Sequence, residues 1–186
     1  MKRAWSVLIV LAVLFLSGGR AFAIPSWDIT HSLSVNGFTN VPAGLTVTSS
    51  GVVHIVYSDV GDSQRMKAIK LEDGTWSTTA SSFTALVNYC ALVRDDDDNL
   101  YLVGRQSTSI VVYKSTDGGE TWPSFLTSSL VIGSTLAPVG AVVDSDGILY
   151  VAYRDSAGTP ASSISIARVL ADGSATVYRD FIGSRG

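Results

Sequence analysis

The chain has 186 residues, with 16 acidic against 13 basic side chains and a formal net charge of −3. This balance, without a stripe of Lys and Arg to displace phosphate counterions, argues against nucleic acid as a partner. The length suits one domain with a single hydrophobic core.

The first 23 residues (1–23) are expected to be a secretory signal peptide. Lys2 and Arg3 precede the apolar stretch 7–16, and Ala21-Phe22-Ala23 forms a small-x-small cleavage site. The alternative is an uncleaved membrane anchor, but this stretch is much shorter than the roughly 20 residues that span a bilayer. We therefore predict a secreted or periplasmic chain without a membrane span. Three of the 13 basic residues leave with the leader, so 10 remain against 16 acidic ones, a formal net charge of −6.

Three segments of the predicted mature chain, 24–186, repeat one pattern. Residues 100–105 and 149–154 align with a shift of 49, and residues 53–58 precede the first of these by 47. Each copy follows a small or acidic turn and is followed by a second run that is typical of a strand, at 66–71, 109–114 and 163–170. Alternating Val, Ile, Tyr and Thr, interrupted by Gly, Asp and Ser, favours strands and tight turns, and no window shows a helical stripe.

A period of nearly 50 residues with about four strands per copy is typical of the blades of a β-propeller. We therefore predict an all-β chain, 24–186, built from four-stranded antiparallel blades. The three blades are expected at about 44–80, 85–127 and 137–180. The run 27–35 is expected to add one further strand, which would belong to a neighbouring blade.

One turn carries a recognisable motif. Ser115-Thr116-Asp117-Gly118-Gly119-Glu120-Thr121-Trp122 fits S-x-D-x-G-x-T-W, and a shortened copy, Asp73-Gly74-Thr75-Trp76, lies one repeat upstream. In such a turn the Asp accepts hydrogen bonds from nearby amides, Gly permits a positive φ and the Trp packs beneath. The motif resembles the Asp box (BNR repeat) of sialidase-type β-propellers. That resemblance implies structural roles for Ser115, Asp117, Gly119, Thr121 and Trp122.

The resemblance also implies a six-bladed ring, of which this chain holds about three blades. Three blades do not close a ring, because known propellers use about four to eight. Three explanations stay open: a truncated product, two copies that complete a ring about a twofold axis, or an open stack with exposed edges. We expect truncation, because the sequence stops just after the fourth strand of the third blade.

Blade topology sorts the polar residues onto two faces. The motif turn, the run Asp95 to Asp98 and the only two glutamates, Glu72 and Glu120, are expected on one face. The resemblance places a sialidase-like active site on the opposite face, so these residues are poor catalytic candidates. A calcium loop is the alternative for the Asp run, since Ca²⁺ favours several carboxylate oxygens. However, the run aligns with the ordinary turn 144–147 and lacks EF-hand spacing, so no metal is expected.

The opposite face collects the ends of three repeated strands. A guanidinium binds a carboxylate through two hydrogen bonds, which suits a sialic or uronic acid, and aromatic rings stack on sugars. The alternative is that each Arg pairs with a neighbouring Asp to neutralise a polar rim. The candidate ligand-binding residues are Arg105, Arg154, Asp59, Asp155, Tyr57 and Tyr153.

A complete sialidase mechanism is not expected. The resemblance calls for three arginines, an Asp acid/base and a Tyr activated by a Glu, and this set is incomplete here. His31 and His54 show no zinc spacing, and no phosphate-loop or dinucleotide motif is present, so no cofactor is expected. Cys90, the only cysteine, lies in an apolar run and is expected to be a buried core residue, with a reactive thiol or an intermolecular bridge as the alternative.

The leading hypothesis is a secreted, non-catalytic propeller segment that presents loops to a glycan or a protein. The alternatives are a truncated or degenerate sialidase-like glycoside hydrolase, and a scaffold or assembly factor, because the fold alone does not determine the function.

Overall fold

The computed structural model describes residues 44–59, 65–77, 81–82, 88–127, 130–131, 139–155 and 163–181. The expected leader, 1–23, and the expected strand 27–35 lie outside these residues. The described part of the chain contains strands and turns but no α-helix, and hence no helix that could cross a membrane. The all-β prediction is therefore confirmed for the described residues.

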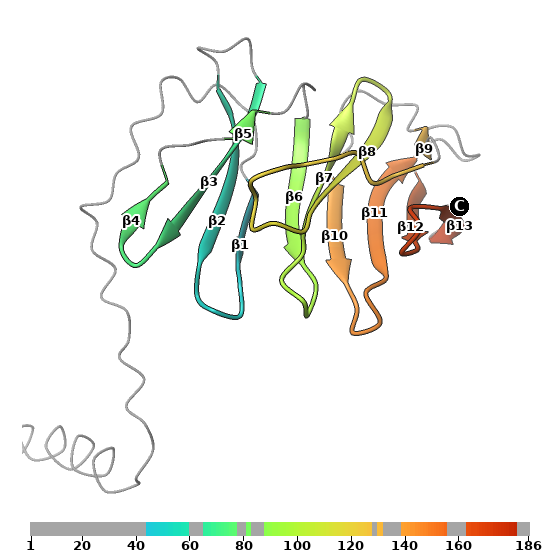
Figure 1. Cartoon of the computed structure of the whole chain (residues 1–186). Helices are drawn as coiled ribbons and strands as arrows, with labels where there is room; N and C mark the ends of the chain where they lie inside the picture. Colours follow the sequence, from blue (N-terminus) through green and yellow to red (C-terminus); the bar gives the residue numbers. More distant parts are fainter. Residues whose placement is uncertain are drawn as a thin grey trace, which may run out of the picture. The chain divides into compact units, whose positions relative to one another are not determined.

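The strands form three antiparallel sheets, coloured from blue to red along the chain in Figure 1. The first sheet has the order β1-β2-β3-β4, with β5 also pairing with β3, and the other two have four strands each, in sequence order. The strands of the first sheet are β1 (Gly44–Val47), β2 (Val53–Asp59), β3 (Arg65–Glu72), β4 (Thr75–Trp76) and β5 (Ser81–Ser82). Those of the second are β6 (Asn88–Arg94), β7 (Leu100–Gln106), β8 (Ser109–Ser115) and β9 (Leu130–Val131). Those of the third are β10 (Val139–Val143), β11 (Leu149–Asp155), β12 (Ser163–Val169) and β13 (Ala175–Phe181).

The first hairpin of each sheet turns in the same way. In the second sheet the Asp95 amide donates to the Asn99 carbonyl at 3.1 Å, and the Asn99 amide donates back to the Asp95 side chain at 2.8 Å. Asp144 and Ile148 repeat both bonds in the third sheet. In the first sheet the Thr48 hydroxyl takes the place of the Asp carboxylate as the acceptor within the turn. A side chain that accepts from its own turn stabilises the turn locally, which explains the small or acidic residue before each repeated strand.

Two apolar clusters lie between the sheets. One joins the first and second sheets and includes Val56, Met66, Leu92, Leu100 and Leu102. The other joins the second and third sheets and includes Tyr101, Val103, Val112, Val151 and Tyr153. Because side chains alternate along a strand, β7 sends Leu100 and Leu102 toward the first sheet and Tyr101 and Val103 toward the third. The middle sheet is therefore buried on both faces, and its first strand, β6, contacts both β1 and β10.

Large exposed apolar side chains occur on the first and third sheets. Leu45 is 60% exposed and Val47 is 44% exposed on β1. On the third sheet Val142 is 59%, Ile164 is 49% and Tyr178 is 50% exposed. Strand alternation directs all five away from the middle sheet. Among the described side chains, the outward faces of the two end sheets are the apolar faces left open.

Candidate functional site

The predicted strand-end residues have little open surface. Tyr57 is 7%, Arg105 is 6% and Tyr153 is 3% exposed, so none of them presents a wide face to a sugar. Arg154 is exposed. Asp59 and Asp155 end β2 and β11, but their side chains lie outside the described residues.

Arg105 and Arg154 lie at equivalent positions in consecutive sheets but in different environments. Arg105 pairs with Ile110 and Arg154 pairs with Ile164, each on the strand that follows in its own sheet. Arg105 is on the face of β7 that the third sheet covers. Arg154 is on the outward face of the third sheet and is exposed. The two guanidinium groups therefore do not share one open surface.

The Asp117 turn, residues 115–122, is held together by its own side chains. Asp117 accepts from the Thr121 amide at 3.0 Å and from the Thr121 hydroxyl at 2.6 Å. The Ser115 hydroxyl donates to Asp117 and accepts from the Gly119 amide at 2.8 Å. Partial burial acts to raise the pKa of Asp117, but the hydrogen bonds from Thr121 and Ser115 outweigh it and leave a pKa of about 2. The Trp122 ring packs against the cluster between the first two sheets.

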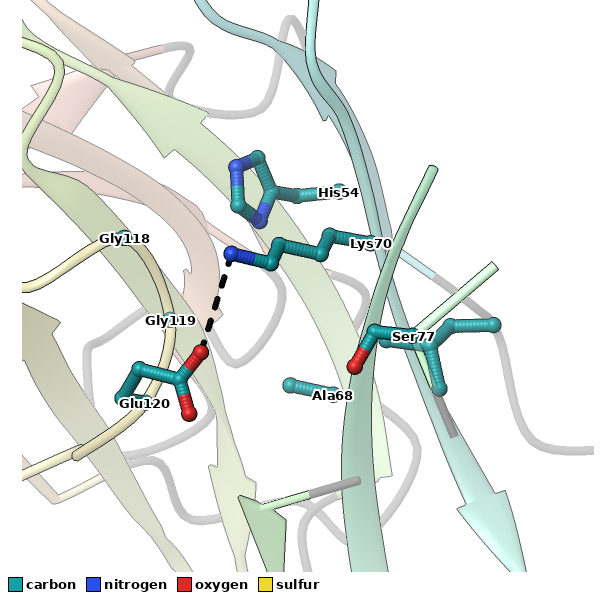
Figure 2. A pocket seen from close by; sticks show the side chains of 8 residues that line it. His54, Ala68, Lys70, Ser77, Gly118, Gly119 and Glu120 are labelled. Carbon is teal, nitrogen blue, oxygen red and sulfur yellow. Dashed lines mark ion pairs between the residues drawn. The ribbon is translucent and has the colours of Figure 1, made fainter. Parts of the chain in front are cut away.

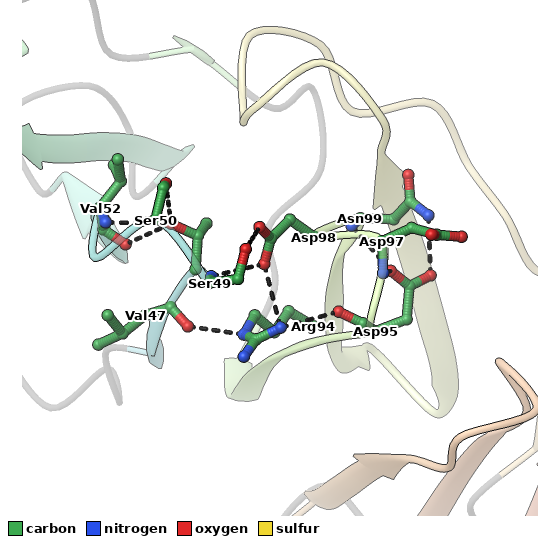
Figure 3. Close-up of polar contacts among 10 residues, drawn as sticks. Val47, Ser49, Ser50, Val52, Arg94, Asp95, Asp97, Asp98 and Asn99 are labelled. Atoms are coloured by element: carbon green, nitrogen blue, oxygen red, sulfur yellow. Dashed lines mark hydrogen bonds and ion pairs between the residues drawn. The ribbon is translucent and has the colours of Figure 1, made fainter.

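Part of the acidic run has structural roles, shown in Figure 3. Asp95 holds its own hairpin and also accepts from the Tyr101 hydroxyl at 2.9 Å. Asp98 accepts from the Ser49 amide and contacts the Arg94 guanidinium at 3.0 Å. No group of three or more His, Cys, Asp or Glu that could hold a metal ion occurs in the described part of the chain.

A polar groove opens where the first and second sheets meet on the turn side. Figure 2 shows the Lys70 ammonium between the His54 ring, which comes from β2, and the Glu120 carboxylate, which comes from the Asp117 turn. Lys70 Nζ lies 3.7 Å from Glu120 Oε1 and 3.4 Å from Glu72 Oε2. Gly119, with a φ of 88°, lies over His54, where an added Cβ would be 3.4 Å from His54 Nδ1. Glycine thus permits both the backbone conformation and the close approach of this turn.

The groove consists of two depressions that meet at Lys70 and Glu72. One, of ≈ 270 Å³, is also lined by His54, Asp98 and the hydroxyl residues Thr48, Ser50 and Thr116. The other, of ≈ 390 Å³, is lined by Asp73, Thr75, Trp76 and Ser77 as well. We call the two together the Lys70 groove.

His54 forms the floor of the Lys70 groove and is 4% exposed. Burial lowers the pKa of His54 and the neighbouring Lys70 lowers it further, while Asp98 and Glu72 act in the opposite direction. The ring is therefore neutral at pH 7, with one nitrogen able to donate and the other able to accept a hydrogen bond. Lys70 and the glutamates above it are more exposed, with 32%, 53% and 58% for Lys70, Glu72 and Glu120.

Sequence reasoning did not find this groove. Lys70 lies on a strand and Glu120 in a turn, 50 positions apart, and no motif links them. The available signal was that both glutamates were expected on the same face. Cys90 lies in the cluster between the first two sheets, and burial raises the pKa of its thiol to about 11, which fits an unreactive core residue.

Comparison with known proteins shows the fold. No family model matches the chain, and no curated protein matches it. An α-L-arabinofuranosidase from Fusarium graminearum, solved with an iminosugar inhibitor, is similar in structure, with a TM-score of 0.60 and 17% sequence identity over 75% of this chain. A protein of unknown function from Dyadobacter fermentans has a TM-score of 0.51 and 16% identity over 75% of this chain. The chain spans 48% of the first of these proteins and 42% of the second. The fold is thus all-β and propeller-like, and it is shared with a carbohydrate-active enzyme.

Proposed function

We propose that this chain is a secreted, sialidase-like Asp-box propeller segment that binds a glycan in the Lys70 groove without cleaving it. The observation that carries this is the arrangement of Lys70 between Glu72 and Glu120 above the buried His54. The Asp117 turn supports the Asp-box assignment, because its bonds join the Ser, Asp, Gly and Thr of the motif. The fold that the chain shares with an arabinofuranosidase supports a carbohydrate ligand.

The groove matches the chemistry of a sugar. Each sugar hydroxyl both donates and accepts, and the groove offers the Lys70 ammonium and the His54 ring as donors beside the Glu72 carboxylate. The Glu120 carboxylate lines a smaller hollow that adjoins the groove at Lys70 and His54. Trp76 adds an aromatic ring to the second depression. Hydrogen bonds to charged groups contribute about 1.5–3 kcal/mol each, so loss of one partner weakens binding about tenfold or more.

The same groups are poorly suited to hydrolysis. The acid of a glycosidase is held in an apolar pocket that keeps it protonated. Glu72 and Glu120 are instead 53% and 58% exposed, and both lie beside the Lys70 ammonium. Binding without turnover is therefore the function that this arrangement supports best. The strand-end Arg154 stays a separate prediction for the carboxylate of an acidic sugar.

Glycan-array binding of the purified full chain tests the groove. We expect Lys70→Ala to weaken retention about tenfold. Lys67→Ala is the matched control, because Lys67 lies on the same strand and alternation directs it to the opposite face. Equal retention by wild type and Lys70→Ala would exclude the groove as the site. Loss of retention with Arg154→Ala but not with Lys70→Ala would move the site to the strand ends.

The alternative functions give different results. A hydrolase would release nitrophenol from a nitrophenyl arabinofuranoside or a nitrophenyl sialoside, and we expect no release. Turnover that disappears in Arg105→Ala or Arg154→Ala would establish the enzyme instead. A scaffold would retain no glycan but would recover a protein on pull-down. N-terminal sequencing of the exported product tests secretion, with Ile24 expected as its first residue.

A further inference from the structure

Where the first and second sheets meet, a leucine on one sheet (the knob) packs against a glycine on the other (the notch). Gly44 on β1 pairs with Val56, and Leu92 on β6 pairs with Leu102. An added Cβ at Gly44 would lie 2.7 Å from the Leu92 Cβ and 3.0 Å from the Leu92 amide nitrogen. Leu92 is 5% exposed. The absence of a side chain at Gly44 therefore leaves the space that the backbone and Cβ of Leu92 occupy.

The contact between the second and third sheets uses the equivalent positions with different residues. Ala91 pairs with Val103 on β7, as Gly44 pairs with Val56 on β2. Ala141 pairs with Val151 on β11, as Leu92 pairs with Leu102 on β7. The strands that carry these alanines, β6 and β10, contact each other. Glycine opposite leucine at one contact is therefore replaced by alanine opposite alanine at the other, so a glycine stands only where the facing side chain is large.

The outward face of the third sheet carries an uncovered glycine, and the outward face of the first sheet carries an uncovered leucine. Both are at positions equivalent to those of the notch and the knob. Gly140 on β10 pairs with Ala152, the equivalent of Val56, and its position lies on the outward face of the third sheet. It is exposed, and no atom lies within 4 Å of an added Cβ. Leu45 on β1 pairs with Ile55, the equivalent of Leu102, and is 60% exposed. Within the described residues, neither position is covered by another sheet.

We propose that Leu45 of one copy of this chain packs into the Gly140 notch of a second copy. The third sheet of each copy then covers the first sheet of the other, twice about a twofold axis, and six sheets form a closed dimer. This contact repeats the way in which consecutive sheets pack within one chain. It places a glycine opposite a leucine, as in the contact between the first and second sheets. It also covers apolar side chains that are 44% to 59% exposed, namely Val47, Val142, Ile164 and Tyr178. Arg154 lies on the covered face, so this contact and a carboxylate ligand at Arg154 exclude each other.

Sedimentation of the purified full chain tests this contact. We expect a particle with twice the mass of one chain. Leu45→Ala removes the knob, and Gly140→Ala places a methyl group where Leu45 must fit, so each change weakens association about tenfold. The double variant Leu45→Ala with Gly140→Ala recreates the alanine pair of Ala91 and Ala141 and removes the overlap, so we expect it to associate more tightly than Gly140→Ala alone.

Both positions are open in a single chain, so these changes leave the fold intact, and near-UV circular dichroism checks this for each variant. A wild-type chain that stays monomeric at about 100 μM would overturn the proposal, because a specific contact of this kind is expected to be tighter. Single variants that associate like wild type would overturn it too, as would assemblies that grow beyond two chains. Glycan binding does not depend on this contact, because the Lys70 groove lies between the first and second sheets of one copy.

Discussion

Asp98, on the turn between β6 and β7, ties the second sheet to Ser49 on the turn between β1 and β2. The Ser49 amide donates to Asp98 Oδ1 at 2.8 Å, and the Ser49 hydroxyl donates to Asp98 Oδ2. Arg94 completes the link, because its guanidinium contacts Asp98 at 3.0 Å and donates to the Val47 carbonyl at 2.7 Å. The side chains of Ser49 and Arg94 lower the pKa of Asp98, with the Ser49 bonds as the larger cause. The charged form of Asp98 therefore holds the two turns together.

Asp98→Asn should lower the Tm by a few degrees. Asparagine tolerates the positive φ of 61° at this position but loses the ion pair with Arg94. Asp97→Asn, the same change at the neighbouring exposed residue, should have little effect. The measurement is thermal unfolding followed by circular dichroism at low salt and at about 1 M salt, where screening should reduce the difference. An equal Tm for both variants would contradict a role for Asp98 between the sheets.

Gly44→Ala should cost about 1–3 kcal/mol of unfolding free energy, because the added methyl group overlaps Leu92. Gly140→Ala makes the same change at the equivalent open position, and within one chain it should cost less than about 0.5 kcal/mol. Urea unfolding at low protein concentration measures both values. Leu92→Ala should cost less in the Gly44→Ala background than alone, because the added methyl group occupies part of the space that the leucine vacates. Similar costs for the two glycine variants would show that the first two sheets do not pack this closely.

Trp122→Phe should destabilise the chain by about 1 kcal/mol more than Trp76→Phe. Trp122 Nε1 donates to the Gly119 carbonyl at 2.9 Å, and phenylalanine loses that bond. The buried Nε1 of Trp76 has no hydrogen-bond partner among the described residues, so phenylalanine removes an unsatisfied donor there. Both substitutions keep an aromatic ring. Urea midpoints for the two variants provide the comparison, and a larger loss for Trp76→Phe would be the contrary result.

The stability of the chain should fall as the pH drops from about 7 to about 5, and His54 should account for part of this fall. Burial and, to a smaller extent, Lys70 hold the pKa of His54 in the folded chain below the ordinary value of 6.5. The unfolded state therefore binds more protons below pH 6.5, so the stabilising contribution is present above that pH and is lost below it. His54→Gln should flatten this part of the curve of Tm against pH. An unchanged slope would show that His54 is not buried next to Lys70.

The strands and turns were predictable because their causes are local. Alternating apolar residues made 53–58, 100–105 and 149–154 strands, and the structure places β2, β7 and β11 over these segments. The bonds of Asp117 join residues within eight positions of each other, and Asp144 bonds its own hairpin in the same way. Such contacts depend little on what lies beyond them.

The candidate site was not predictable to the same degree. Arg105 and Arg154 looked equivalent in the repeat, but a neighbouring sheet covers Arg105 and leaves Arg154 open. No residue in either strand carries that information. The pairing of Lys70 with Glu120 likewise requires the first sheet to pack beside the Asp117 turn.

The sequence by itself determined the β-strand pattern, the hairpins and the internal bonds of the Asp117 turn, because strand alternation and side-chain-to-backbone hydrogen bonds act over a few residues. The tertiary structure alone decided which side chains are open to a ligand, since burial depends on a sheet that is distant in sequence. It also decided the fit of Leu92 against Gly44 and left Leu45 and Gly140 uncovered. Packing between sheets is a property of pairs of surfaces, and one strand's sequence describes only half of each pair.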